Sequence, residues 1–175
     1  MKKLILSAAL IMTLVITAFA QNEVQSNKFS FSAGPEAGFA TGSFSGTHSV
    51  GIGGSAQAEY FVMDKLKATV TIGLLTYVGK SYSSNTDNAA QSIIPLRIGG
   101  KYFLTGGLYG GAQLGVAFLG NFYKGTAFAY SPLMLGYEFK TKSAKSIDAT
   151  IKYDGYTGAG AGTIGAFGAR LAYVF

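Results

Sequence analysis

The 175-residue chain has no cysteine and no tryptophan, only one histidine and three prolines, and few charges: Asp, Glu, Lys and Arg together make up 13%. The absence of cysteine excludes a disulfide framework and a thiolate metal site, so stability must come from burial and backbone pairing. No basic cluster stands out, which argues against a nucleic-acid partner.

The first twenty residues are typical of a secretory signal peptide. Lys2 and Lys3 form a positive start, an apolar stretch follows over 4–16, and Ala18-Phe19-Ala20 is an A-x-A cleavage site. A membrane-spanning helix is the competing interpretation, but the apolar run is short and ends in small residues. We therefore expect a signal peptide at 1–20, a short mature segment at 21–27 and one domain at 28–175.

Glycine and aromatic residues are what the chain has in abundance. It holds 25 glycines, 11 tyrosines and 13 phenylalanines. Each glycine inside a helix would cost about 1 kcal/mol relative to alanine, so this density disfavours long helices. It suits strands with close backbone approaches.

After residue 27 the hydrophobic pattern has a period of two. The stretch "SIDATIKYD" is the clearest case, with Ile147 and Ile151 on one face and Asp148 and Lys152 on the other. Such alternation predicts strands with one apolar and one polar face, and nothing helical between them. The predicted strands are 28–42, 49–62, 65–79, 93–104, 108–120, 127–140, 146–154 and 163–175.

The connectors between these strands alternate in length. "MDK", "TGG" and "TKSA" follow the second, fourth and sixth strands, whereas mostly longer segments such as "KSYSSNTDNAAQ" follow the odd-numbered ones. Short turns on one side and longer loops on the other are typical of outer-membrane barrels. The pattern predicts an all-β fold, an eight-stranded antiparallel up-and-down transmembrane β-barrel with both termini on the short-turn side.

The polarity of the two faces decides which of them meets lipid. A soluble sandwich also alternates, but its solvent face should be highly charged, whereas here the polar faces are rich in Gly, Ser, Thr and Ala. The strands also exceed the usual soluble length of about 5–6 residues. In lipid every backbone group must pair internally, so the sheet must close. We expect the apolar faces to point outward and the polar faces inward.

One group of aromatic residues lies on the apolar face near the short-turn end of the strands. An amphipathic ring at that depth would sit among lipid headgroups. The pattern predicts a periplasmic-side girdle of Phe29, Tyr60, Tyr102, Tyr137 and Tyr173.

The inward positions carry five acids and five bases. An eight-stranded barrel is only wide enough for its own side chains, and charges there are costly unless paired. We expect packed ion pairs rather than a conduction path. The predicted lumen charge network is Glu36, Glu59, Lys67, Arg97, Lys101, Glu138, Asp148, Lys152, Asp154 and Arg170.

The three prolines fall inside predicted strands. Proline removes a ladder donor, and a closed barrel has no free edge. Pro35, Pro95 and Pro132 should therefore each lie at a bulge or near the rim.

Catalytic and metal chemistry find little support. His48 and Ser49 are adjacent and would point to opposite faces of a strand, so they do not form a nucleophile and base pair. His48 is expected in solvent on a loop. Asp87 alone is a poor basis for a calcium cage. The sequence predicts no catalytic, cofactor or metal site and no enzyme activity.

The segment "ARLAYVF" over 169–175 alternates apolar and aromatic residues and ends in Phe175. With the eight strands, it resembles the small outer-membrane barrels of the OmpA/OmpX-like group of Gram-negative bacteria. The resemblance implies that Leu171, Tyr173 and Phe175 form a signal read by the barrel-assembly machinery. It also implies export to the cell outer membrane, contact with outer-membrane lipid and a monomeric state.

The expected function is a non-catalytic structural or surface-interaction role, with an unknown surface partner. The alternative is a narrow pore or small-ligand carrier, in the membrane or secreted as a soluble barrel.

Overall fold

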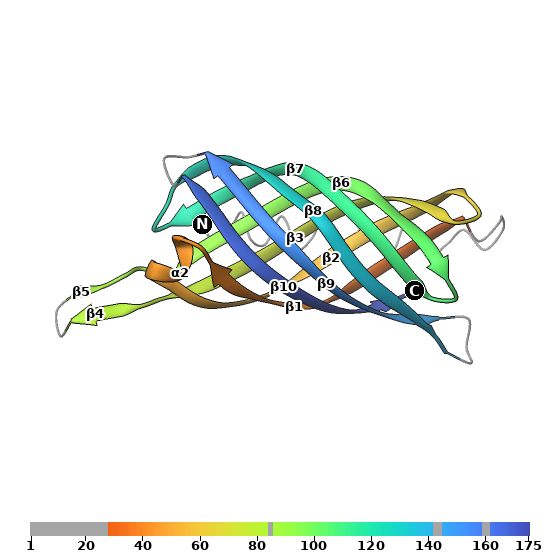
Figure 1. The fold of residues 1–175 in the computed structure, drawn as a ribbon, viewed down its shortest axis with the longest axis horizontal. Coiled ribbons are helices and arrows are strands. Elements are labelled where there is room, and N and C mark those ends of the chain that lie inside the picture. Colours follow the sequence, from red (N-terminus) through yellow and green to blue (C-terminus); the bar gives the residue numbers. More distant parts are fainter. Residues whose placement is uncertain (1–27, 84–85, 142–144, 159–161) are drawn as a thin grey trace, which may run out of the picture.

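The computed structural model describes residues 28–83, 86–141, 145–158 and 162–175. The expected signal peptide at 1–20 and the segment 21–27 lie outside the described residues. Eight long strands close into a barrel in the order β1-β10-β9-β8-β7-β6-β3-β2 (Figure 1). These strands are β1 (Phe29–Thr41), β2 (His48–Met63), β3 (Leu66–Gly79), β6 (Gln91–Thr105), β7 (Leu108–Asn121), β8 (Gly125–Lys140), β9 (Ser146–Gly158) and β10 (Thr163–Val174).

Each barrel strand pairs antiparallel with its neighbours along the chain, and β1 pairs with β10 to close the ring. The predicted eight-stranded antiparallel up-and-down barrel is therefore confirmed. The strand positions follow the sequence because a period of two allows each strand to bury one face and expose the other.

The two ends of the barrel differ in their connections. At the short-turn end, β2 and β3 are joined by Asp64 and Lys65 alone, and β6 and β7 by Gly106 and Gly107. Gly106 has a φ of 55°, a left-handed conformation that glycine adopts without strain. The start of β1 and the end of β10 also lie at this end, since Phe175 donates its backbone N–H to the carbonyl of Phe31.

The long-loop end carries three elements that the sequence did not predict. One is a four-residue helix, α2 (Phe44–Thr47), which corrects the expectation of nothing helical between the strands. The others are β4 (Ser81–Ser83) and β5 (Thr86–Asp87), a small hairpin that projects beyond the barrel in Figure 1. Among the described residues, no helix is long and apolar enough to cross a membrane.

Alternation along the strands separates an exposed apolar face from a buried inner face. On β3, the side chain of Ile72 is 46% exposed on the outside, whereas its neighbour Thr71 is 4% exposed inside. All eight barrel strands expose large apolar side chains in this way. The apolar faces therefore point outward, as the sequence predicted.

The prolines interrupt the ladders in two different ways. Pro132 lies at a bulge, because the register of β8 with β9 shifts between Tyr130 and Leu133. Pro35 and Pro95 do not lie at a bulge or at the rim, which corrects that expectation. The β1–β10 pairing skips Gly34 and Pro35, and the β3–β6 pairing skips Pro95, while the register on either side is unchanged. A missing N–H thus costs a local ladder contact without shifting a strand.

Candidate functional site in the barrel lumen

Strand alternation places all ten predicted lumen charges inside the barrel. Nine of them are buried, and the side chain of the tenth, Glu138, is 12% exposed. They form two groups of ion pairs at different depths, and Arg170 stands apart from both. Charges removed from water in this way are tolerated only where partners satisfy them.

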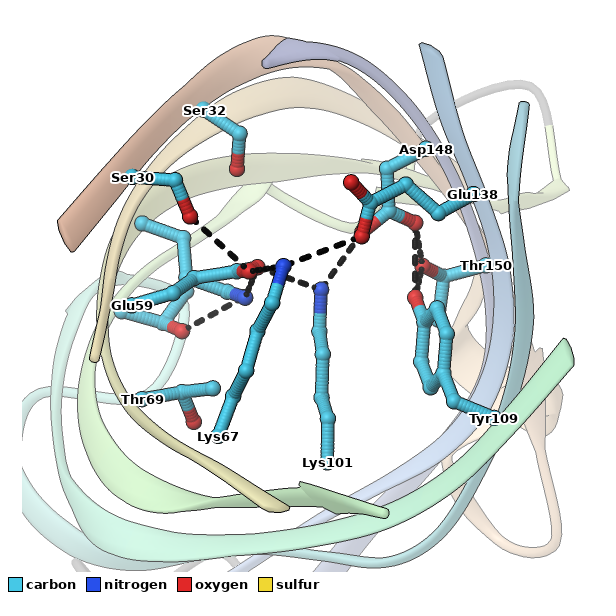
Figure 2. A network of polar contacts seen from close by, with 12 residues as sticks. Ser30, Ser32, Glu59, Lys67, Thr69, Lys101, Tyr109, Glu138, Asp148 and Thr150 are labelled. Carbon is cyan, nitrogen blue, oxygen red and sulfur yellow. Dashed lines mark hydrogen bonds and ion pairs between the residues drawn. The ribbon is translucent and has the colours of Figure 1, made fainter. Parts of the chain in front are cut away.

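The first group lies in the short-turn half of the lumen and is centred on Lys101 (Figure 2). The ammonium of Lys101 is 2.6 Å from Glu59 Oε1 and 2.5 Å from Asp148 Oδ2. Since Lys101 is on β6, Glu59 on β2 and Asp148 on β9, these two contacts join opposite walls. Asp148 also accepts hydrogen bonds from the hydroxyls of Tyr109, at 2.6 Å, and Thr150, at 2.7 Å.

Lys67 makes a second crossing beside the first. Its ammonium is 2.8 Å from Glu59 Oε2 and 3.0 Å from Glu138 Oε2, so it links β3 with β2 and β8. The same ammonium lies 4.7 Å from the ring centroid of Phe61 and 5.0 Å from that of Phe103. A cation held by two carboxylates and two ring faces has little freedom to move.

The second group lies nearer the middle of the lumen. Arg97 Nη1 is 3.0 Å from Asp154 Oδ1, and Arg97 Nη2 donates to the hydroxyl of Tyr156 at 2.5 Å. Lys152 Nζ is 2.5 Å from Glu36 Oε1 and 3.4 Å from Asp154 Oδ2. Strands β6, β9 and β1 are linked by these contacts.

Arg170 is the exception to the expected pairing. Its guanidinium donates to Ser55 Oγ at 2.8 Å and to Ser32 Oγ at 3.0 Å, and it has no carboxylate within 4.0 Å among the described residues. Glu36 lies opposite Arg170 in the β1–β10 register, but its carboxylate contacts Lys152 instead. Being neighbours in the strand register therefore does not by itself determine which charged side chains form ion pairs.

The long-loop half of the lumen is apolar, which the sequence analysis missed. Phe44 of α2 enters the barrel mouth, is 3% exposed and contacts the ring of Tyr77 edge-on at 5.2 Å between centroids. The signal was present, because Leu75 and Ile93 share the inward alternation of Lys67 and Arg97. This apolar layer consists of Phe44, Leu75, Tyr77, Ile93, Ala117, Leu119, Ala127, Ala129, Tyr156, Ile164 and Ala166.

His48 is buried within this end of the barrel, which corrects its expected place in solvent. Its Nε2 lies 3.2 Å from the carbonyl of Ala89, so Nε2 carries the hydrogen, and Nδ1 is 2.9 Å from Thr47 Oγ1. Its ring stacks on Phe44 at 4.5 Å. His48 therefore joins α2 to the segment that follows β5.

A cavity of about 750 Å³ opens at the short-turn end. Lys67 and Glu138 belong to its lining, together with Phe61 and Phe103. The cavity is therefore a vestibule whose inner end meets the first group of ion pairs. Beyond the vestibule, the lumen holds those pairs and, further toward the long-loop end, the apolar layer.

The five predicted girdle residues lie on the outside at the short-turn end. Their exposed fractions are 67% for Phe29, 37% for Tyr60, 51% for Tyr102 and 41% for both Tyr137 and Tyr173. The rings of Phe29 and Tyr60 touch at 4.5 Å between centroids.

Further outward rings occupy the same depth. Phe139 contacts Tyr137 at 4.6 Å and Phe175 contacts Tyr173 at 5.2 Å. The three residues of the expected assembly signal, Leu171, Tyr173 and Phe175, all face outward on the last strand or directly after it.

Comparison with known proteins leads to the same architecture. No protein-family model and no curated protein sequence matches the chain. The crystal structure of Ail, the attachment invasion locus protein of Yersinia pestis, matches with a TM-score of 0.55 and 14% identity over 86% of this chain and all of Ail.

Two further structures match at lower TM-scores. Ail in complex with the heparin analogue sucrose octasulfate gives 0.49 at 17% identity, over 86% of this chain and 100% of that one. The solid-state NMR structure of outer membrane protein AlkL in DMPC bilayers gives 0.48 at 15% identity, over 88% and 93%.

This is the fold of a small outer-membrane barrel. At these identities the likeness concerns the fold alone.

Proposed function

We propose that the mature chain is an integral outer-membrane barrel with a sealed lumen, whose role is structural or lies in surface contact through its longer loops. The observation that carries the proposal is the combination of an apolar exterior on every barrel strand with ion pairs that cross the lumen. An exterior of this kind is covered by lipid or by another protein, since soluble monomers rarely expose apolar patches above a few hundred Å².

The ion pairs that cross the lumen support this role over the narrow pore. A pore needs a continuous hydrated path, whereas Lys67 and Lys101 are both buried within the crossing ion pairs. The apolar layer lies further along the same lumen, in its long-loop half. The test is planar-bilayer conductance of the purified barrel, with a porin as the positive control. We expect no conductance steps, and stable steps above the lipid baseline would overturn the sealed lumen.

A non-catalytic role is supported by the surroundings of His48. Its ring nitrogens contact the hydroxyl of Thr47 and a backbone carbonyl, and Ser49 Oγ donates to the carbonyl of Val78. No nucleophile, base and acid converge among the described residues. We expect the mass of lipid A to be the same in cells with and without the gene. A mass difference restored by the wild-type chain would contradict this part of the proposal.

The structural role and the surface role can be separated with the β4–β5 hairpin. A variant in which a two-residue turn replaces residues 81–87 keeps every barrel strand. If the role is structural, this variant should restore the detergent resistance of a deletion strain as well as the wild-type chain does. If the role is surface contact, the deletion strain should lose attachment of cells to their surface rather than detergent resistance, and the hairpin variant should fail to restore that attachment. Failure of the wild-type chain to affect either property would refute both roles.

A further inference from the structure

The outer face of β8, β9 and β10 at the short-turn end carries an apolar strip beside aromatic side chains. Ile147, Ala149 and Ile151 face outward along β9, and we call these three residues the β9 strip. Aromatic side chains flank it on both sides, because Phe139 pairs with Ile147 across β8 and Tyr173 pairs with Ile147 across β10.

The strip has a low point at Ala149. Its register partners are Tyr137 on β8 and Leu171 on β10, whose outward side chains are much larger than a methyl group. Ile147 and Ile151 are four positions apart, which is about 13 Å along a strand at roughly 3.3 Å per residue. A membrane strand is tilted by about 45°, so the strip covers roughly 9 Å of the about 15 Å depth of one hydrocarbon leaflet and borders more than half of an acyl chain.

Lys145 lies at the head of the strip. Its side chain is exposed, and its ammonium is 5.6 Å from the ring centroid of Tyr173. Its backbone is fixed, since its carbonyl accepts hydrogen bonds from the amide and the hydroxyl of Thr141. Within the described part of the chain, no carboxylate lies within 4.0 Å of this ammonium.

The charge around Lys145 is positive. Among the described residues outside the network of ion pairs, the short-turn end holds Lys28, Lys65, Lys140 and Lys145 against Asp64 and the terminal carboxylate of Phe175, and all of these except Lys28 line the rim of the vestibule. Such an excess favours contact with an anionic lipid surface by about 1 kcal/mol for each nearby lysine. Tyrosines at the same depth add hydroxyl donors at the level of the headgroups.

We propose that Lys145, Tyr173 and the β9 strip bind one phospholipid that carries a net negative headgroup. The ammonium of Lys145 contacts the lipid phosphate, the ring of Tyr173 lies beside the headgroup, and one acyl chain runs along the strip over Ala149. This site rests on the proposed residence in a membrane but is specific to one part of the barrel circumference. It differs from general lipid contact in preferring an anionic headgroup.

The test is native mass spectrometry of the folded, delipidated barrel titrated with phosphatidylglycerol or phosphatidylcholine of equal chain length. We expect one phosphatidylglycerol adduct to form at a lower lipid concentration than the phosphatidylcholine adduct. Lys145→Gln should reduce this preference about fivefold, the loss expected for one interfacial lysine. Ala149→Phe should weaken the adducts of both lipids, because the ring fills the space over the strip.

Two matched controls lie elsewhere on the barrel. Lys124→Gln removes an exposed lysine at the long-loop end, and Ala112→Phe adds a ring at an exposed outward position of β7. Both should leave the adducts unchanged. Equal affinity for the two lipids, or equal effects of Lys145→Gln and Lys124→Gln, would overturn the proposal.

Folding of every variant is checked by its migration in SDS before and after boiling, because folded membrane barrels resist unfolding until heated. A wild-type chain that shows no heat-modifiable band would refute the proposed residence in the membrane. A heat-modifiable chain without a lipid preference would sink only the phospholipid site.

Discussion

The two halves of the lumen are packed by different physical means. In the short-turn half, Lys67 and Lys101 hold carboxylates from distant strands through short, directional contacts. In the long-loop half, Phe44 fills volume among apolar side chains at the mouth of the barrel. A directional contact depends on both partners, whereas apolar packing depends mainly on total volume. The polar half should therefore tolerate substitution much less than the apolar half.

The largest effect should come from Lys101→Met. Among the described residues, the substitution leaves Asp148 without a lysine partner and leaves Glu59 with Lys67 as its one remaining cationic partner. Removing one member of a buried charge group costs about 3–5 kcal/mol. Urea unfolding in lipid vesicles, followed by far-UV circular dichroism because the chain has no tryptophan, should show this loss. The control is Lys65→Met, an exposed lysine, and an equal effect of the two variants would refute the role of the crossing pairs.

The second effect should come from Phe44→Ala in the apolar half. Emptying a buried phenylalanine site costs about 3 kcal/mol, whereas the near-isosteric Phe44→Leu should cost less than about 1.5 kcal/mol. The same unfolding assay measures both variants. Conductance should stay at the lipid baseline in Phe44→Ala because the ion pairs still cross the lumen. If Phe44→Ala alone opened a channel, the apolar layer would be the sole seal.

A third test uses the glycines beneath Tyr77. A Cβ at position 51 would lie 2.7 Å from the ring of Tyr77, whereas a Cβ at position 120 would meet nothing within 4 Å. Overpacking of this kind costs roughly 1–3 kcal/mol, so Gly51→Ala should destabilise the barrel and Gly120→Ala should change its stability by less than about 1 kcal/mol. Equal stabilities of the two variants would show that the ring of Tyr77 moves aside without cost.

The smallest effect should come from Arg170→Met within the polar half. Arg170 contacts the hydroxyls of Ser32 and Ser55, so its loss leaves no carboxylate without a cationic partner. The substitution should lower the free energy of unfolding by about 1 kcal/mol. Arg97→Met should cost more, because Asp154 would lose one of its two cationic partners. The unfolding midpoints of the two variants give the comparison. A larger loss for Arg170→Met would mean that an unseen partner holds this guanidinium.

The barrel itself could be predicted from the sequence, because the alternation that determines each strand lies within that strand. The alternation of Ile147 and Ile151 with Asp148 and Lys152 determines both the strand and its two faces. The same pattern recurs in each of the remaining barrel strands. Connector lengths then order the strands. The inward position of the apolar layer follows from the same alternation, since Tyr77 shares the inward side of β3 with Lys67.

The pairing inside the lumen could not be predicted from the sequence. It depends on the tilt and stagger of the closed sheet, which bring Lys67 of β3 to Glu138 of β8 and keep Glu36 away from its register neighbour Arg170. The helix α2 was missed because four residues are too short to show a helical period. The burial of His48 follows from that helix, since Phe44 and Thr47 surround its ring.

The central claim is that lipid covers the outward face of every strand. Because the chain has no cysteine, single spin labels can be attached at Ile72→Cys, Leu114→Cys and Ile151→Cys on three sides of the barrel. In membranes, collisions of each label with oxygen, which concentrates in lipid, should exceed collisions with a water-soluble nickel complex. Faster collisions with the nickel complex at these positions would contradict the claim.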